Sequence, residues 1–290
     1  MAHTSIWAEI SSTPHELRYV DVAGVATRVL RAGSGPDLVL LHGTGGHLEA
    51  YARNIAPLAA HFTVTAYDMV GHGWSDLPDK PYTIDVLADH LVKLLDVLGI
   101  ESAHLSGESL GGWVAAWTAA HYPDRVDGLV LNTPGNIANK PEVMERLKAS
   151  TLAAVTDPTD ETVRRRVEWL FHDKTQVTDE LVRLRQAVYT RPGYLRAIEN
   201  TLVLQDPAVR RDYAWDPSWV GLISAPTLLL WTSHDPTGGL DEAELLQTWI
   251  PRSRLQVIDD AGHWPQWEKP DEFLTAHVEF LRSLTSGAVG

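Results

Sequence analysis

The pentapeptide Gly-Glu-Ser-Leu-Gly at residues 107–111 constrains the fold of this chain more than any other segment. It follows the apolar stretch 103–105 and precedes an amphipathic run from Gly112, which is the order strand, sharp turn, helix. Glycine at both ends removes side chains that would clash in a tight turn, so a strained backbone can hold the Ser109 hydroxyl out at the end of a sheet. The pattern predicts a nucleophile elbow, provided that the partners of a nucleophile follow downstream.

Apolar strands and helical patterns alternate over most of the chain. Residues 17–31 predict two antiparallel strands around Gly24, and residues 84–95 carry apolar side chains at the helical period. Strands that alternate with helices indicate a mostly parallel sheet covered on both faces. Further buried strands are predicted at 37–41, 62–67, 126–131, 226–231 and 254–258.

The alternation stops between Pro134 and Ile223, where only helical patterns appear. We interpret residues 135–223 as a helical cap inserted into a core formed by 1–134 and 224–290, because helices folded over a pocket exclude water from the chemistry below. The alternative is a separate helical domain with no catalytic role. The predicted cap helices are 141–154, 160–171, 179–189 and 194–204.

Composition excludes several classes of function. A net charge of −14 would repel nucleic acid and an anionic membrane surface, and the absence of cysteine excludes disulfides, thiolate nucleophiles and cysteine metal sites. The thirteen histidines form no spaced ligand cluster, so no metal is expected. Residues 1–5 have no basic stretch before an apolar core, and no run reaches the roughly 18 apolar residues of a membrane helix. These features predict a cytoplasmic protein.

A serine nucleophile needs a histidine base, and that histidine needs an acceptor that fixes its tautomer. Asp235 lies just beyond one predicted buried strand and His263 beyond the next, where loops build active sites in open α/β sheets. The order Ser109, Asp235, His263 is that of α/β-hydrolases. Asp259 and Asp260 are alternative acids, but they precede His263 on its own strand and are poorly placed to reach the ring.

The Gly-rich segment 41–46 predicts a loop that supplies oxyanion donors. We expect the backbone amides of Thr44 and Leu110 to be these donors. The alternative, a loop that cradles a phosphate, would need three glycines at other spacings. Residues 68–76 are interpreted as a structural loop beside the site.

With these residues in place, the chain resembles the α/β-hydrolase superfamily over nearly its whole length. More narrowly, Gly-His-Trp-Pro-Gln-Trp-Glu at 262–268 is similar to the histidine motif of the meta-cleavage product hydrolases. In that family a cap arginine binds the carboxylate end of the substrate, and the similar segment 180–185 implies this role for Arg185. The resemblance implies an α/β-hydrolase fold with an inserted cap. It also implies substrate contacts by Gly43, Gly45, Glu108, Arg185 and Trp264.

Two departures from the family concern the substrate. The family usually has asparagine before the nucleophile, where this chain has Glu108, and its Gly-rich loop is commonly longer, with a downstream asparagine where this chain has Ala50. An ionised Glu108 that faces the pocket would repel an acidic substrate. If Glu108 faces away, it binds neighbouring loops.

The resemblance implies a serine hydrolase that cleaves a carbon–carbon bond in 2-hydroxy-6-oxo-dienoates, the ring-fission products of aromatic degradation, without metal or organic cofactor. An ester or lactone hydrolase with the same triad is the alternative; Arg185 in the pocket favours the dienoate, whereas a pocket lined by tryptophan favours the ester. A ligand receptor on the same fold is a third possibility. We expect a small-molecule substrate, and a homodimer is a guess without an interface feature behind it.

Overall fold

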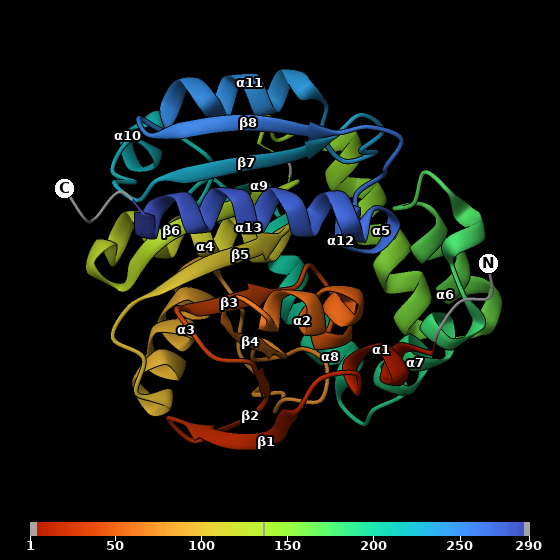
Figure 1. Cartoon of the computed structure of the whole chain (residues 1–290). Helices are drawn as coiled ribbons and strands as arrows, with labels where there is room; N and C mark the ends of the chain where they lie inside the picture. The colour runs from red at the N-terminus through yellow and green to blue at the C-terminus, as the bar shows by residue number, and fades with distance from the viewer. Residues whose placement is uncertain (1–4, 136, 287–290) are drawn as a thin grey trace.

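One eight-stranded sheet forms the centre of the computed structural model, with helices on both faces (Figure 1). The structure describes residues 5–135 and 137–286. Predictions that concern the first four residues, including the absence of a leader, lie outside the described residues. The same holds for positions 136 and 287–290 within the predicted domain boundaries.

The strand order is β1-β2-β4-β3-β5-β6-β7-β8. The β1–β2 and β2–β4 pairs are antiparallel, and all other pairs are parallel, so the predicted mostly parallel α/β sheet is confirmed. The strands are β1 (His15–Val22), β2 (Val25–Ala32), β3 (Asp37–Leu41), β4 (Thr63–Tyr67), β5 (Ala103–Glu108), β6 (Val126–Asn132), β7 (Thr227–Thr232) and β8 (Ser253–Ile258).

The central strands β3, β5, β6 and β7 are almost entirely buried because both faces of the sheet are covered. In β3, Leu38 and Leu40 join one core cluster, and Val39 and Leu41 join the other on the opposite face. The helices outside the predicted cap are α1 (Ile6–Ile10), α2 (Ala52–Ala59), α3 (Ile84–Leu98), α4 (Leu110–His121), α11 (Leu240–Trp249), α12 (Pro265–Glu268) and α13 (Pro270–Ser286), with 3₁₀ turns η1 (Leu48–Tyr51) and η2 (Pro123–Arg125).

Helix α3 illustrates how sequence fixes an element. Leu87, Leu91 and Leu94 recur at helical spacing and are buried against the sheet face that also carries α4. The helix ends at Gly99, whose φ of 69° is a left-handed conformation that glycine adopts without strain. The prediction of a helix up to Gly99 is therefore confirmed.

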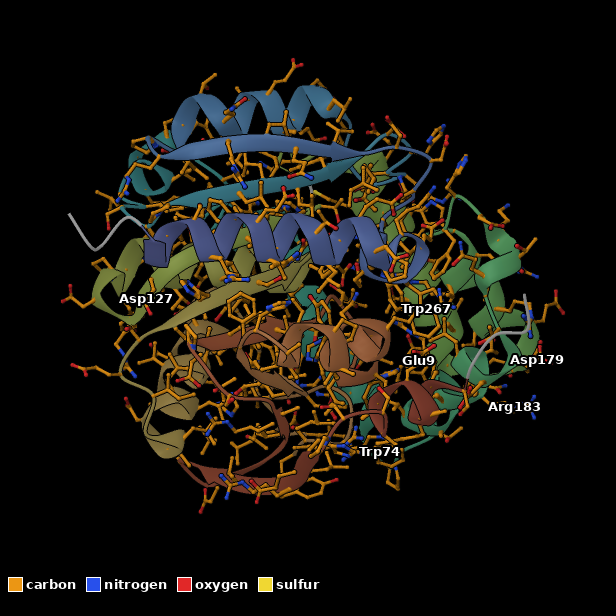
Figure 2. All side chains as sticks on the ribbon, in the orientation of Figure 1. Glu9, Trp74, Asp127, Asp179, Arg183 and Trp267 are labelled. Atoms are coloured by element: carbon orange, nitrogen blue, oxygen red, sulfur yellow. The ribbon has the colours of Figure 1, made fainter. Side chains whose placement is uncertain are left out.

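Only helices occur among the described residues between β6 and β7, as predicted. Figure 1 shows the arrowheads of β7 and β8 pointing toward the green helices of this segment, so these helices cover the carboxyl ends of the strands. In Figure 2, Asp179 and Arg183 lie on the outer rim of this helical segment. The elements are α5 (Pro141–Thr156), α6 (Asp160–Glu168), η3 (Lys174–Gln176), α7 (Asp179–Tyr189), α8 (Tyr194–Leu202), η4 (Val203–Gln205), α9 (Pro207–Arg210) and α10 (Pro217–Val220).

Side-chain caps explain where two of these helices begin. Thr159 accepts a hydrogen bond from the Thr162 amide at 3.2 Å before α6, and Thr178 accepts one from the Leu181 amide at 3.2 Å before α7. Helix α6 ends at Glu168, three residues before the predicted end. Sequence analysis missed the short helices α1, α9 and α10. None of the described helices is both long and apolar enough to cross a bilayer.

Candidate active site

Ser109 lies between β5 and α4 with φ 54° and ψ −117°, a conformation that L-residues rarely adopt. A Cβ on Gly107 would lie 2.2 Å from the Gly111 carbonyl oxygen, and one on Gly111 would lie 2.2 Å from the carbonyl oxygen of Leu41. Only glycine fits at either position. The structure thus contains the sharp strand-to-helix turn that the sequence predicts.

Asp235 and His263 meet at the carboxyl end of the sheet, after β7 and β8. His263 Nδ1 lies 3.0 Å from both carboxylate oxygens of Asp235, and Thr237 Oγ1 donates to Asp235 at 2.8 Å. Both partner side chains are buried. The alternatives Asp259 and Asp260 are exposed, and the polar partners of the His263 ring in the described chain are Asp235, Thr237 and Glu108. The geometry favours Asp235 as the residue that orients His263.

The other ring nitrogen of His263 faces Glu108 and not the nucleophile. Nε2 lies 3.2 Å from Glu108 Oε1, and among residues 5–135 and 137–286 no hydrogen bond joins Ser109 Oγ to His263. Glu108 is 1% exposed, and its Oε2 has no hydrogen-bond partner. A Cβ on Gly43 would lie 2.5 Å from this oxygen, so the carboxylate packs against a glycine backbone. Glu108 therefore faces the pocket.

Burial and neighbouring charges shift the pKa values of this pair. Burial raises the pKa of Glu108, although the positive charges of His263 and Arg185 oppose the rise. Burial alone would lower the pKa of His263, but the charges of Asp235 and Glu108 outweigh it and raise the pKa despite the opposing charge of Arg166. Both groups thus bind a proton more tightly than they would in water, and because they are in contact they titrate as a pair.

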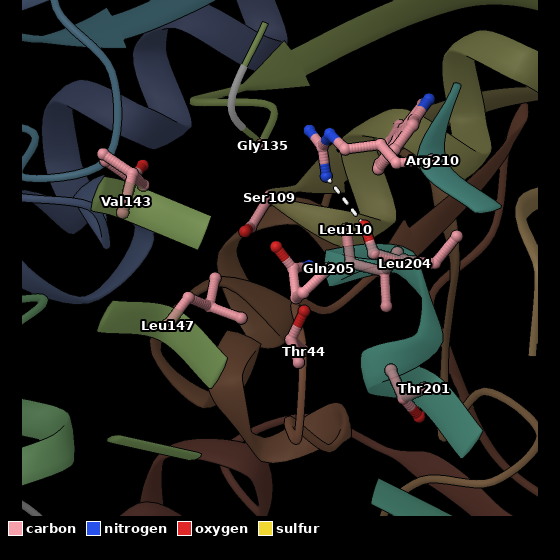
Figure 3. Close-up of a pocket in the computed structure, with 12 residues that line it drawn as sticks. Thr44, Ser109, Leu110, Gly135, Val143, Leu147, Thr201, Leu204, Gln205 and Arg210 are labelled. Atoms are coloured by element: carbon pink, nitrogen blue, oxygen red, sulfur yellow. Dashed lines mark hydrogen bonds between the residues drawn. The ribbon is translucent and has the colours of Figure 1, made fainter. Parts of the chain in front are cut away.

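Two small hollows adjoin at Ser109, Thr44 and Leu147, which line both. Figure 3 shows the first, in which Ser109 and Thr44 face the side chains of Leu147, Leu204 and other residues. The first hollow is mainly apolar and is further lined by Leu110, Trp113, Gly135, Val143, Thr201, Leu204, Gln205, Arg210 and Thr237. The second is rich in charge and is further lined by Gly43, Glu108, Arg166, Leu170, Arg185, His263 and Trp264.

Arg185 projects from α7 into the charged hollow and is 1% exposed. Its Nη1 donates to the Tyr189 hydroxyl at 2.9 Å and to the Gly45 carbonyl oxygen at 3.4 Å, and its guanidinium lies over the Trp264 ring at 4.8 Å. Its Nε has no hydrogen-bond partner. Gly45 and Trp264 thus hold Arg185, and Gly45 itself lines neither hollow.

Arg166 is a second buried arginine in the charged hollow, and sequence analysis missed it. It is 4% exposed, its Nε donates to Thr151 at 3.1 Å, and its Nη1 has no hydrogen-bond partner. Burial lowers the pKa of Arg166 to about 10. The sequence feature that could have revealed Arg166 is its position on the helix, because Val163 and Val167 on the same face are also buried.

The amides predicted to bind the oxyanion lie beside the nucleophile. Thr44 and Leu110 line the apolar hollow together with Ser109, and within the described chain neither amide donates to another acceptor. Gly135 lies on the other side of the nucleophile, where a Cβ on it would be in ordinary van der Waals contact with Ser109 Oγ at 3.6 Å. The role of the two amides remains a prediction that this arrangement permits.

His42 anchors the Gly-rich loop. Its Nδ1 donates to the Gly43 carbonyl oxygen at 2.9 Å, and its Nε2 accepts from the Met69 amide at 3.1 Å. This pattern requires a neutral ring, and burial keeps the pKa of His42 well below its usual value. His42 therefore ties the loop of Thr44 to the loop that follows β4.

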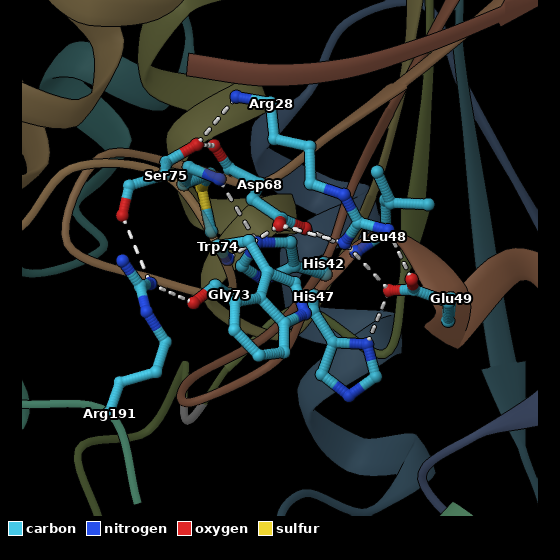
Figure 4. A network of polar contacts seen from close by, with 11 residues as sticks. Arg28, His42, His47, Leu48, Glu49, Asp68, Gly73, Trp74, Ser75 and Arg191 are labelled. Carbon is cyan, nitrogen blue, oxygen red and sulfur yellow. Dashed lines mark hydrogen bonds and ion pairs between the residues drawn. The ribbon is translucent and has the colours of Figure 1, made fainter. Parts of the chain in front are cut away.

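A closed cluster of charges holds the loop after β4 (Figure 4). Asp68 accepts from the Leu48 amide at 2.7 Å, from the Trp74 amide at 2.7 Å and from Arg28 at 3.2 Å. Arg28 also pairs with Glu49 at 2.5 Å. These contacts fit the prediction of a structural loop beside the site.

A second buried serine–histidine hydrogen bond joins Ser106 Oγ and His277 Nε2 at 2.8 Å. His277 Nδ1 donates to the Phe273 carbonyl oxygen at 2.8 Å, where a catalytic histidine would meet a carboxylate. Burial lowers the pKa of His277 to about 4, so the ring is neutral. Neither residue lines the hollows at Ser109, which makes this pair a packing contact beneath the site.

The structure brings together three potential ligand residues that sequence spacing does not reveal. The side chains of His172, His234 and Asp260, distant in sequence, place one potential ligand atom each within 4.8 Å of one another. The rings of His172 and His234 stack at 3.9 Å. All three residues are exposed, and none lines the hollows at Ser109.

Comparison with known proteins identifies the family of this chain. A family model described as alpha/beta hydrolase fold matches residues 36–270. The chain is 34% identical to 2-hydroxy-6-oxo-6-phenylhexa-2,4-dienoate hydrolase of Comamonas testosteroni, covering 97% of both chains. It is 33% identical to 2-hydroxymuconate semialdehyde hydrolase of Pseudomonas sp. strain CF600, covering 96% of this chain and 98% of that protein. A solved meta-cleavage product hydrolase from Pseudomonas fluorescens IP01 aligns with a TM-score of 0.81 at 31% identity, covering 92% of this chain and 97% of the other.

Proposed function

Because the chain belongs to the alpha/beta hydrolase fold family and, within it, to the meta-cleavage product hydrolases, we propose that it hydrolyses a carbon–carbon bond in 2-hydroxy-6-oxo-dienoate ring-fission products of aromatic degradation. One observation carries the assignment beyond fold. Arg185 is buried in the same hollow as Ser109 and His263, with its Nε unpartnered, and so offers a cation to an acidic substrate. An ester pocket has no need of this cation.

The proposed chemistry starts from the ketonised dienoate. Ser109 Oγ attacks the remote ketone while His263 Nε2 takes its proton, and Asp235 stabilises the resulting imidazolium. The carbon–carbon bond then breaks, its electron pair moves through the conjugated system to the ketone oxygen of the departing fragment, and this oxygen takes the proton from His263 to give a dienol. Water activated by His263 hydrolyses the acyl-enzyme and releases the acid. The Thr44 and Leu110 amides are the oxyanion donors in both steps.

The proposed substrate spans the two hollows, which meet at Ser109. The carboxylate end of the dienoate lies in the charged hollow toward Arg185, and the acyl end lies in the apolar hollow beside Trp113 and Leu204. A guanidinium that binds one end of the chain fixes the distance of the ketone from the nucleophile. Arg185 therefore positions the substrate for attack and also contributes to affinity.

An ester or lactone hydrolase is the competing function, because the Trp113-lined hollow would also accept an acyl group. To separate them, we would measure kcat/KM for a coloured 2-hydroxy-6-oxo-dienoate and for a p-nitrophenyl ester on one preparation, with Ser109→Ala as the blank. We expect the dienoate value to be at least about tenfold higher, which corresponds to about 1.4 kcal/mol of transition-state stabilisation. A preference for the ester would reject the proposed carbon–carbon hydrolase.

The remaining expectations stay predictions. A cytoplasmic location suits a small-molecule catabolic enzyme, and a homodimer would be tested by light scattering of the purified chain. Neither enters the mechanism above.

A further inference from the structure

Both ring nitrogens of His263 face a carboxylate. Nδ1 lies 3.0 Å from Asp235, and Nε2 lies 3.2 Å from Glu108 Oε1. A base for Ser109 must present a lone pair on Nε2, yet a buried ring between two carboxylates is stabilised by a proton on each nitrogen. Glu108 thus lies where it opposes the neutral form of His263.

The neighbouring positive charges of His263 and Arg185 favour the ionised form of Glu108, against burial, which raises its pKa. Arg166 from α6 and Arg185 from α7 line the same hollow as Glu108 and His263. Tyr51 is a further titratable neighbour of Glu108; burial raises the pKa of its hydroxyl well above the usual value, so Tyr51 stays neutral. Together with Asp235, the hollow holds three cationic and two anionic groups when His263 is protonated, which leaves it able to take an anionic substrate.

We propose that Glu108 holds a proton on His263 Nε2 in the free enzyme and thereby stores the proton that ketonises the bound dienolate before Ser109 attacks. The inference rests on the proposed function for its second half only. Glu108 acts through His263 and is therefore a positioning residue for the proton.

The proton transfer balances without another reactant. The Nε2–H bond breaks and its electron pair stays on nitrogen, while π electrons of the dienolate form the new C–H bond and its oxygen becomes a ketone carbonyl. Neutral His263 is then the base that Ser109 requires. After the acyl-enzyme is hydrolysed, the carboxylic acid product gives up its proton, which returns to His263.

This arrangement suits an enolate and handicaps an ester. An ester has no carbon that takes the proton, so a charged His263 must first lose it to solvent before Ser109 can attack. The dienolate removes the proton in the course of its own reaction. The identity of residue 108 thus sets how strongly the site prefers an enolate over an ester.

The first test observes His263 directly in the full-length free protein. ¹⁵N-labelled histidine NMR, with His263→Asn to assign the signal, gives the protonation of Nε2 against pH. We expect a midpoint above the ordinary value of about 6.5 in the wild type and a midpoint lower by at least about 1 pH unit in Glu108→Gln. A neutral His263 in the wild type at pH 6.5, or equal midpoints in the two proteins, would overturn the proposal.

Arg166→Met is the opposite-sign control, because Arg166 lowers the pKa of His263. We expect its midpoint to move upward, and the acid limb of kcat/KM for a p-nitrophenyl ester to follow the same order across the three proteins. A merely structural role of Glu108 would lower the rate at every pH without moving the limb. If Glu108→Gln fails to fold, the wild-type titration and Arg166→Met still decide the outcome.

Single-turnover absorbance tests the transfer to carbon. We expect Glu108→Gln to slow loss of the dienolate colour by at least about tenfold, while ester hydrolysis at pH 6 rises several-fold because more His263 is neutral. Unchanged decay of the dienolate would reject the transfer. If the wild type leaves the dienoate intact, the proposed function fails, whereas the NMR and ester results still judge the role of Glu108.

Discussion

Two buried clusters of charge lie close to the Gly-rich loop, and they differ in how their polar atoms are partnered. In the cluster of Arg28, Glu49 and Asp68, each of these three side chains makes at least two polar contacts (Figure 4). In the cluster around His263, Glu108 Oε2, Arg185 Nε and Arg166 Nη1 have none, and all three side chains face a hollow. Because unpartnered buried polar atoms cost free energy, the second cluster is built to meet a ligand, and the first to hold the fold.

The largest expected effect comes from removing the nucleophile beside the cluster around His263. Ser109→Ala should lower kcat by at least about 10⁴-fold, because without Oγ no acyl-enzyme forms. Its thermal midpoint should stay within a few degrees of the wild type, since the side chain makes no hydrogen bond in the described structure. Parallel kinetics and thermal melts check this. Substantial residual turnover that depends on His263 would show that another group attacks.

In the cluster of Arg28, Glu49 and Asp68, a substitution should lower stability and not catalysis. Arg28→Met should lower the free energy of unfolding by about 3–5 kcal/mol, because it leaves two buried carboxylates without their cation. Arg31→Met on the same strand is the matched control: its pair with Asp37 is about a quarter exposed and should contribute at most about 1 kcal/mol. Urea denaturation measures both. Similar losses in the two variants would show that the Arg28 cluster is not specially stabilising.

Sequence analysis predicted the sheet, the elbow and the convergence of Ser109, Asp235 and His263 because each depends on local order along the chain. Parallel strands bring their carboxyl ends to one edge whatever the loops do. The contacts of Glu108 and the burial of Arg166 could not be read this way, because they arise where α6 and α7 fold over the strand ends. The grouping of His172, His234 and Asp260 could not be predicted either, because these residues are distant in sequence and meet only in the folded chain.

Arg185 and Arg166 nonetheless left a trace in the sequence. Both lie on the buried faces of their helices, between apolar residues three or four positions away. An arginine within an apolar stripe either pairs with an acid or faces a cavity, whereas Arg183 on the same helix as Arg185 is 71% exposed in its side chain. The helical period of the amino-acid sequence thus separates candidate ligand residues from surface charges.

Arg185→Gln should have an intermediate effect that is confined to the acidic substrate. We expect kcat/KM for the dienoate to fall about 10- to 100-fold, because one charge-assisted contact to the carboxylate is lost, while the ester value changes only a few-fold. Arg183→Gln on the outer face of α7 is the control and should match the wild type. Equal losses on both substrates would mean that Arg185 supports the cap and does not bind the carboxylate.

The smallest expected effect is a difference in how the free energy of unfolding changes with pH, which should have opposite signs for the two clusters. Burial would raise the pKa of Glu49, but its bonds to His47 and Arg28 lower it to about 2, so its stabilisation is present at neutral pH and is lost as pH falls toward 2. The pKa values of Glu108 and His263 are raised, so their protonated forms stabilise the fold at low pH, and this contribution is lost as pH rises through the raised values.

Glu108→Gln should therefore flatten the decline in stability toward alkaline pH. The variant should gain stability relative to the wild type between pH 5 and pH 8, because it lacks the raised pKa of Glu108 and the charge that raises the pKa of His263. Urea denaturation at both pH values measures the difference. Glu49→Gln should show the opposite trend, with a stability loss that shrinks as pH falls. If the free energy of unfolding changes equally with pH in the wild type and in Glu108→Gln, the cluster around His263 stores no proton. Its unpartnered polar atoms would then act only in substrate binding.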